Sequence, residues 1–253
     1  MREMLTCHDI HKSYGGVLVL RGVTLDVRAG EILGLIGANG AGKSTLIDII
    51  SGLTPATSGE IRIAGEPILK SSAASRAQVG LARTFQHPQI AGELTLRQNI
   101  LAACAAERLS SPGRALSTFL SGFVNVFTER DDEADEICDR LGLRYPDRLA
   151  SEVTFGELRL VEFARALIQK PRVVVLDEPF SGVGDEGISG ILDALRTLRA
   201  TGCAVLLVDH NIDLITTLVD RMVLLAQGEI LVEGSVESCL ASELFRSTYI
   251  GVV

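Results

Sequence analysis

The chain has 253 residues, of which 47% are hydrophobic and only 4% aromatic, and it contains no tryptophan. An aliphatic core of this kind suits a parallel sheet that is covered on both faces, and the length suits one domain with an inserted subdomain. The formal net charge of −8 argues against nucleic-acid binding, because phosphate backbones attract basic surfaces. We therefore expect no nucleic-acid partner.

The cysteine content and the hydropathy of the chain indicate where in the cell it is expected. The cysteines are odd in number and show neither a CxxC nor a metal-ligand spacing: Cys7, Cys104, Cys138, Cys203 and Cys239. This usage predicts a reducing compartment and argues against a disulfide framework or a zinc site. Residues 1–11 carry charges and no long apolar stretch, so we expect no signal peptide. The longest apolar runs, such as 203–208, are far shorter than a membrane span. We expect a cytoplasmic chain that can serve a membrane only from its surface.

The first third of the chain predicts short strands and one helix. Alternation predicts a strand over 23–27, and an apolar run predicts a buried strand over 31–36 that ends in a glycine-rich loop. A helix is expected over 43–51. Residues 59–67 have a hairpin pattern, and residues 80–85 read as a further strand.

Helical spacing replaces this pattern in the middle of the chain. It is shown by Leu94, Leu96, Ile100, Leu101 and Ala105, and again by Ile137, Leu141 and Leu143. Residues 110–114 look like a loop, and we interpret the acidic run 129–136 as a solvated helix face rather than a metal site. We expect an inserted helical subdomain over 88–170.

Strands return after Pro171. Apolar runs at 173–176 and 204–208 flank a helix predicted over 185–199, and residues 222–232 form a hairpin pattern. Strands that alternate with helices indicate a parallel-sheet α/β core.

One loop carries a phosphate-binding pattern. Residues 37–45 read Gly-Ala-Asn-Gly-Ala-Gly-Lys-Ser-Thr, which matches G-x-x-x-x-G-K-[ST]. Its glycines let successive N–H groups point at an anion, and the helix that follows adds its positive end. Lys43 can reach the terminal phosphates, and the Ser44 hydroxyl can ligate Mg²⁺. The predicted nucleotide-binding residues are Gly37, Asn39, Gly40, Ala41, Gly42, Lys43, Ser44 and Thr45. A chance glycine turn is disfavoured, because a strand precedes the loop and a helix follows it.

An acidic pair follows a buried strand at the edge where α/β sheets bind ligands. We predict that Asp177 holds Mg²⁺ and that Glu178 is the general base that activates water. Alone, Asp-Glu after a strand is usually a surface turn. The presence of the phosphate loop in the same chain favours the functional interpretation of this acidic pair.

With these motifs the chain resembles the nucleotide-binding subunits of ABC transporters over nearly its whole length. The resemblance implies a P-loop nucleotide-hydrolase α/β core (1–87 and 171–253) with an antiparallel β edge and an inserted helical signature subdomain (88–170). It implies ATP and Mg²⁺ as ligands. Gln86 corresponds to the glutamine that touches Mg²⁺ and senses the membrane partner, His210 to the switch histidine, and Tyr14 to the aromatic that stacks on adenine. A lone residue of each kind is usually structural, and their order along the chain favours the functional roles.

The family's signature, typically L-S-G-G-Q, has an altered counterpart at 153–157, Val-Thr-Phe-Gly-Glu. The resemblance implies that Thr154, Gly156 and Glu157 contact a nucleotide held by a second ATPase subunit. Glu157 adds a negative charge there, and Gly184 stands where an Asp or Asn is common. We therefore expect pairing with a different subunit that has a conventional signature, the alternative being a homodimer.

Residues 80–86, 209–211 and 249–251 resemble ATPases of branched-chain amino-acid importers, with urea-type importers as close relatives. The expected function is ATP hydrolysis coupled to solute uptake at the cytoplasmic face of the cell membrane. Permease subunits and, indirectly, a solute-binding protein would be its partners. The alternatives are an ATP-binding interaction subunit with weak hydrolysis and a soluble non-transport ABC ATPase. The second is disfavoured, because such proteins usually carry two cassettes or basic surfaces.

Overall fold

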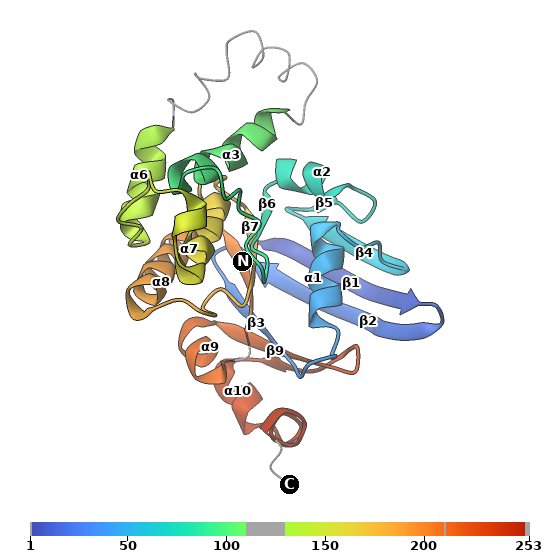
Figure 1. Ribbon diagram of the computed structural model, residues 1–253. Coiled ribbons are helices and arrows are strands. Elements are labelled where there is room, and N and C mark those ends of the chain that lie inside the picture. Colours follow the sequence, from blue (N-terminus) through green and yellow to red (C-terminus); the bar gives the residue numbers. More distant parts are fainter. Residues whose placement is uncertain (1, 110–129, 210, 251–253) are drawn as a thin grey trace. The chain divides into compact units, whose positions relative to one another are not determined.

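The computed structural model describes residues 2–109, 130–209 and 211–250 (Figure 1). It divides into two compact units. The first unit comprises Met1–Leu81, Arg172–Glu178 and Leu198–Val253, and the second comprises Ala82–Pro171 and Pro179–Thr197. The structure groups residues 82–87, which sequence analysis assigned to the α/β core, with the helical unit. It does the same with residues 179–197.

The reason lies in helix α8 (Asp185–Ala200). Its Gly190 is so close to the preceding helices that an added Cβ would lie 2.9 Å from the Cα of Leu141, and a Cβ at Gly187 would lie 3.0 Å from Leu160. The first thirteen residues of α8 therefore pack as part of the second unit.

The first unit contains an antiparallel sheet of four strands in the order β2-β1-β4-β5. The strands are β1 (Glu3–Tyr14), β2 (Val17–Arg28), β4 (Ser58–Ile63) and β5 (Glu66–Pro67). The turn from β1 to β2 consists of Gly15 and Gly16, which both have positive φ, and it places Tyr14 opposite Val17.

A second sheet has the order β10-β9-β3-β8-β7-β6. It is formed by β3 (Ile32–Ile36), β6 (Leu81–Arg83), β7 (Val173–Asp177), β8 (Ala204–Val208), β9 (Arg221–Ala226) and β10 (Glu229–Gly234). The pairs β9-β3, β3-β8 and β8-β7 are parallel, and β9-β10 is an antiparallel hairpin. Every residue of β3, β7 and β8 is buried, so the predicted α/β core with an antiparallel edge is confirmed.

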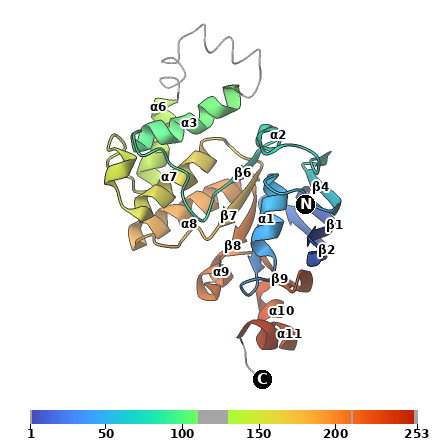
Figure 2. The same ribbon diagram turned by 45° about the vertical axis from the view of Figure 1, so that its right-hand side comes forward.

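Helices complete the first unit: α1 (Lys43–Ser51), α2 (Ala73–Gln78), α9 (Ile212–Leu218), α10 (Val236–Ala241), α11 (Glu243–Phe245) and a π-helical turn (Arg246–Ile250). One aliphatic cluster joins α1 to strands of both sheets, including β1, β3 and β8 (Figure 2). This common core fixes the start of α1, which follows the phosphate-loop sequence.

The second unit is mainly helical, with α3 (Leu96–Leu109), α6 (Asp131–Arg140), a 3-10 turn (Ala150–Glu152), α7 (Phe155–Leu167) and most of α8. Helix α7 packs against α3 and α6. The predicted loop at 110–114 lies outside the described residues. Across the described ranges, no helix combines the length and the apolar character needed to cross a membrane.

Acidic residues of α6 form ion pairs within the second unit. Glu133 pairs with Lys170 at 2.8 Å, and Asp135 pairs with Arg97. Among the described residues, no group of His, Cys, Asp or Glu has the arrangement of a metal site. The four cysteines with described side chains are free and buried: Cys7, Cys138, Cys203 and Cys239.

Candidate functional site

The phosphate loop connects β3 to α1, and two of its glycines are sterically required. A Cβ at Gly37 would lie 2.2 Å from the carbonyl oxygen of Leu225. A Cβ at Gly42 would lie 2.8 Å from Leu20, and its φ of +108° favours glycine independently. The loop is therefore pressed against β9 and β2 at both ends, whereas residues 38–40 are exposed.

The start of α1 suits an anion. Its N-cap is Gly42 in the left-handed conformation, and glycine has no side chain with which to cap the first amides. A helix N-terminus with such amides attracts phosphate groups. Gly40 also has a positive φ, and a Cβ there would meet open space. The loop thus offers main-chain donors on an accessible surface, as nucleotide phosphates require.

Lys43 connects the loop to the acidic pair. Its Nζ donates hydrogen bonds to the carbonyl oxygens of Gly37 at 2.6 Å and Ala38 at 3.1 Å. Burial lowers the pKa of Lys43, and the nearby carboxylates of Glu178 and Asp177 partly oppose this shift. The structure therefore brings together the lysine and the two acids that sequence analysis had assigned to the site.

The acidic pair ends β7 in a distinctive main-chain conformation. Asp177 is the last strand residue and is 9% exposed. Glu178 has a φ of +49°, and its amide donates to the carbonyl oxygen of Val208 at 2.8 Å. A non-glycine residue in this region costs of order 1–3 kcal/mol, so neighbouring structure holds Glu178 at the sheet edge. Such a cost is common at functional sites.

One further predicted residue, Tyr14, is described in the first unit. Tyr14 is 48% exposed, and the Nζ of Lys12 lies 4.5 Å from its ring centroid. Lys12 itself is buried and donates to the carbonyl oxygen of Pro55 at 2.7 Å. Asp209 is buried and accepts a hydrogen bond from the amide of Asn211 at 3.0 Å. His210 lies outside the described residues.

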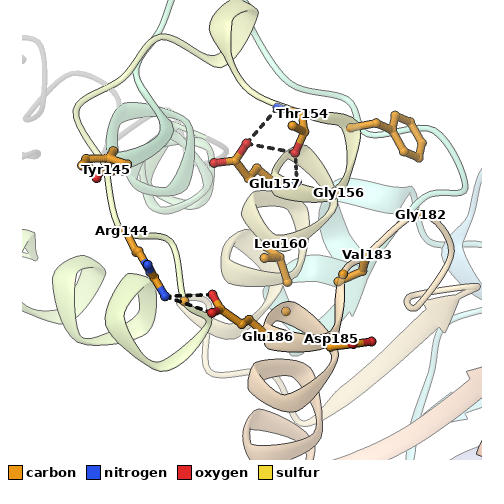
Figure 3. Close-up of a pocket in the computed structure, with 14 residues that line it drawn as sticks. Arg144, Tyr145, Thr154, Gly156, Glu157, Leu160, Gly182, Val183, Asp185 and Glu186 are labelled. Carbon is orange, nitrogen blue, oxygen red and sulfur yellow. Dashed lines mark hydrogen bonds and ion pairs between the residues drawn. The ribbon is translucent and has the colours of Figure 1, made fainter.

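The signature counterpart lines a pocket of about 680 Å³ in the second unit, together with residues 182–187 (Figure 3). Thr154 caps α7, and Glu157 returns the interaction, so the two form a capping box. Gly156 is required, because a Cβ would lie 2.6 Å from the carbonyl oxygen of Gly182. The pocket also contains an ion pair between Arg144 and Glu186 at 3.0 Å.

Phe155 is a feature of this pocket that sequence analysis did not interpret. It is 50% exposed, and the guanidinium of Arg159 lies 5.4 Å from its ring centroid. A Cβ at Gly182 would touch the ring at 3.0 Å. The signal was present in the sequence, because the first glycine of L-S-G-G-Q is replaced by this aromatic residue. Gly184, in contrast, has open space around it.

Gln86 belongs to the second unit and is exposed, in a segment of irregular structure after β6. Its neighbour Phe85 is bound through both main-chain polar groups to side chains of α7, Glu162 and Arg159. Sequence analysis named Gln86 but not these two anchors.

A glycine-rich loop between a buried parallel strand and a helix, with a lysine near paired carboxylates, defines a P-loop nucleotide-binding protein. The family model described as ABC transporter matches residues 20–181. The chain belongs to this family, as the ATP-binding cassette that binds and hydrolyses ATP.

Similar proteins include both import and export components. A probable branched-chain amino acid transport ATP-binding protein of Methanocaldococcus jannaschii is 31% identical, over 98% of each chain. A lipopolysaccharide export system ATP-binding protein of Haemophilus influenzae is 32% identical, also over 98% of each chain. The crystal structure of a nucleotide-free ATP-binding cassette from an ABC transporter is 31% identical, with a TM-score of 0.84 over 99% of this chain and all of that one.

Proposed function

We propose that this chain is the ATP-hydrolysing subunit of an ABC importer that acts at the cytoplasmic face of the cell membrane. The observation that carries the hydrolytic role is that β3, which leads into the phosphate loop, and β7, which ends in the acidic pair, are parallel strands on either side of β8. Both carboxylates of the pair also act electrostatically on Lys43. In this proposal the loop amides and Lys43 bind the phosphates of ATP, and Glu178 takes a proton from the attacking water. His210 contacts the γ-phosphate, and Tyr14 stacks on adenine.

Oxygen ligands for Mg²⁺ are available in the first unit. Ser44 has a hydroxyl in the first turn of α1, and Asp177 has a carboxylate near Lys43, which are groups that Mg²⁺ prefers. The bound ion would neutralise charge on the phosphates. The proposed set also includes Gln86, which follows from the resemblance to the family.

We propose branched-chain amino acids as the transported solutes. The supporting observations are the sequence resemblances at 80–86, 209–211 and 249–251 and the similarity to an amino-acid transport ATPase. The similarity to a lipopolysaccharide export ATPase is equally strong. The experiment must therefore distinguish import from export. Permease subunits and a solute-binding protein are the proposed partners.

A second candidate is an ATP-binding interaction subunit that hydrolyses ATP weakly. The altered signature favours it, because Phe155 and Glu157 stand in the pocket where the family has a glycine and a glutamine. Under this alternative, slow turnover would be a property of the chain itself.

The test is reconstitution of the chain with its proposed permease subunits in lipid vesicles. The expected result is ATP hydrolysis that rises when leucine-loaded binding protein is added. Hydrolysis stimulated by lipopolysaccharide instead would replace the importer by an exporter. Turnover that stays near background with every partner present would favour the interaction subunit. Glu178→Gln in the same vesicles is the control for contaminating ATPases.

A further inference from the structure

The irregular segment that carries Gln86 is held by the side chains of one helix. Residues 84–90 form neither helix nor strand, so their main-chain polar groups need partners outside regular structure. The amide of Phe85 donates to Glu162 Oε1 at 2.8 Å. The carbonyl oxygen of Phe85 accepts from Arg159 Nη1, also at 2.8 Å. Both polar groups of the residue beside Gln86 are therefore bound by α7.

A third contact holds the other side of the segment. Arg165 Nη1 donates to the carbonyl oxygen of Gln89. Arg159, Glu162 and Arg165 follow one another at intervals of three residues, so they share a face of the helix. Helix α7 thus binds the chain on both sides of Gln86.

The two side chains that bind Phe85 are buried, which is unusual for charged residues. Arg159 and Glu162 are each only 4% exposed, and burying ionisable groups is costly unless hydrogen bonds compensate. An apolar residue would fill the position of Glu162 without that cost. The acceptor that the Phe85 amide requires, which an apolar residue lacks, explains the buried polar side chain at this position.

Among the residues that the structure describes, the charged groups that act on Glu162 are the guanidinium groups of three arginines. Burial raises the pKa of Glu162 to about 7, against the opposing influence of the Phe85 amide and of Arg159, Arg165 and Arg83. Arg83 also lies over the ring of Phe85, 4.8 Å from its centroid. Phe85 is therefore enclosed by polar groups that fix both its main chain and its ring.

The same helix begins at the signature. The capping box of Thr154 and Glu157 forms the start of α7, and the three anchors lie on the turns that follow. We propose that Arg159 and Glu162 are positioning residues that hold the main chain beside Gln86 against the signature helix and so fix the place of Gln86. This inference rests on the proposed role of Gln86 in hydrolysis.

The test uses steady-state ATP hydrolysis by the full chain with its partners. Glu162→Ala is expected to lower kcat about tenfold while KM for ATP changes less than about twofold, because the phosphate loop is intact. Glu162→Gln keeps a carbonyl acceptor and is expected to restore most of kcat. In a Gln86→Ala background, Glu162→Ala is expected to cause no further loss. Arg97→Ala is the matched control, since Arg97 pairs with Asp135 and Asp147 in the same unit.

Each outcome decides between positioning and simple stabilisation. Equal losses from Glu162→Ala and Arg97→Ala, or losses that multiply with Gln86→Ala, would overturn the proposal. If Gln86→Ala alone had no effect on kcat, the proposed role of Gln86 in hydrolysis would be refuted, and this result is distinguishable from a failure of the positioning proposal. Should Glu162→Ala not fold, Arg159→Met keeps the aliphatic length and removes the donor to Phe85. A fall in kcat is then expected, and an unchanged kcat overturns the proposal.

Discussion

Glu157 accepts two hydrogen bonds from Thr154, one from the main-chain amide at 2.8 Å and one from the hydroxyl at 2.9 Å. The carboxylate is thus directed toward the start of its own helix, where the positive end of the helix stabilises it. Because the Thr154 hydroxyl gives its hydrogen to Glu157, that hydrogen does not serve a phosphate in this arrangement. The local stability of α7 and the chemistry of the signature therefore depend on the same side chain.

Glu178→Gln should abolish turnover and spare binding. The change keeps the size of the side chain and removes the base, so hydrolysis is expected to fall roughly 10²–10⁴-fold with nearly normal ATP affinity. Paired hydrolysis and nucleotide-binding assays measure both quantities. Glu229→Gln, an exposed acid of the same unit, is the control. An unchanged rate in Glu178→Gln would rule out Glu178 as the base.

Lys43→Ala should weaken binding itself. The ammonium group lies against the loop carbonyls of Gly37 and Ala38, and a charge-assisted contact to phosphate is roughly twice as strong as a neutral one. Titration with a fluorescent ATP analogue should show a raised dissociation constant. Lys70→Ala removes an exposed lysine of the same unit and should leave the titration unchanged. Equal effects from the two variants would show that only net charge matters.

Tyr14 should contribute through its ring. Stacking on a base is worth about 1–3 kcal/mol in single-stranded nucleic-acid complexes, and the ring is half exposed at the end of β1. Tyr14→Ala is expected to raise the ATP dissociation constant about 5- to 150-fold, whereas Tyr14→Phe is expected to do little. If both variants lose affinity equally, the hydroxyl rather than the ring is responsible.

Apolar residues after Gln86 should dock a short helix of the membrane subunit. Leu94 is 36% exposed and Ile90 is partly exposed, and an amphipathic helix would cover them. Aspartate at either position is expected to uncouple transport while nucleotide binding stays normal, which vesicle uptake and ATP titration would measure. Leu231→Asp, at a residue of β10 with 37% exposure, is the control. Normal uptake by the Ile90 and Leu94 variants would refute this location.

Sequence periodicity predicted the buried parallel strands well and the first strand poorly. The runs in β3, β7 and β8 are buried on both faces, so they are apolar without interruption. In β1, Leu5, Cys7 and Ile10 are buried, but the pairing register shifts between Cys7 and Ile10. Asp9 has a φ of +50° at this irregularity. The extra residue breaks the two-residue period, and the charged residues around it concealed the strand.

The catalytic candidates could be read from the sequence because glycine spacing and strand ends have a direct geometric meaning. The anchors of Gln86 could not. Arg159 and Glu162 occur in a helical sequence where charged residues are usually solvated, and no local pattern shows that they bind the main chain of Phe85. Such long-range contacts between side chain and main chain become visible only once the helix is packed.

The last prediction concerns pairing. The resemblance to ABC transporter ATPases implies head-to-tail pairs in which one subunit's phosphate loop meets the other's signature. In this chain the phosphate loop and acidic pair converge, whereas the signature carries the half-exposed Phe155 and the charge of Glu157. The capping box turns the Glu157 carboxylate toward its own helix, which lessens but does not remove the repulsion that this negative charge exerts on γ-phosphate. We therefore expect pairing with a different ATPase subunit that has a conventional signature.

In such a pair the two sites are unequal. The site with this chain's phosphate loop and the partner's signature should carry most of the turnover, so Glu178→Gln here should cost far more activity than the equivalent change in the partner. The double substitution Phe155→Gly and Glu157→Gln gives the signature the glycine and glutamine that are typical of the family. It should raise the rate of hydrolysis at the weaker site, because it removes both the bulky ring and the negative charge. Hydrolysis by the co-purified pair measures both effects. Equal losses from the two base substitutions would mean that the sites are symmetric, and the altered signature would then be compatible with a homodimer.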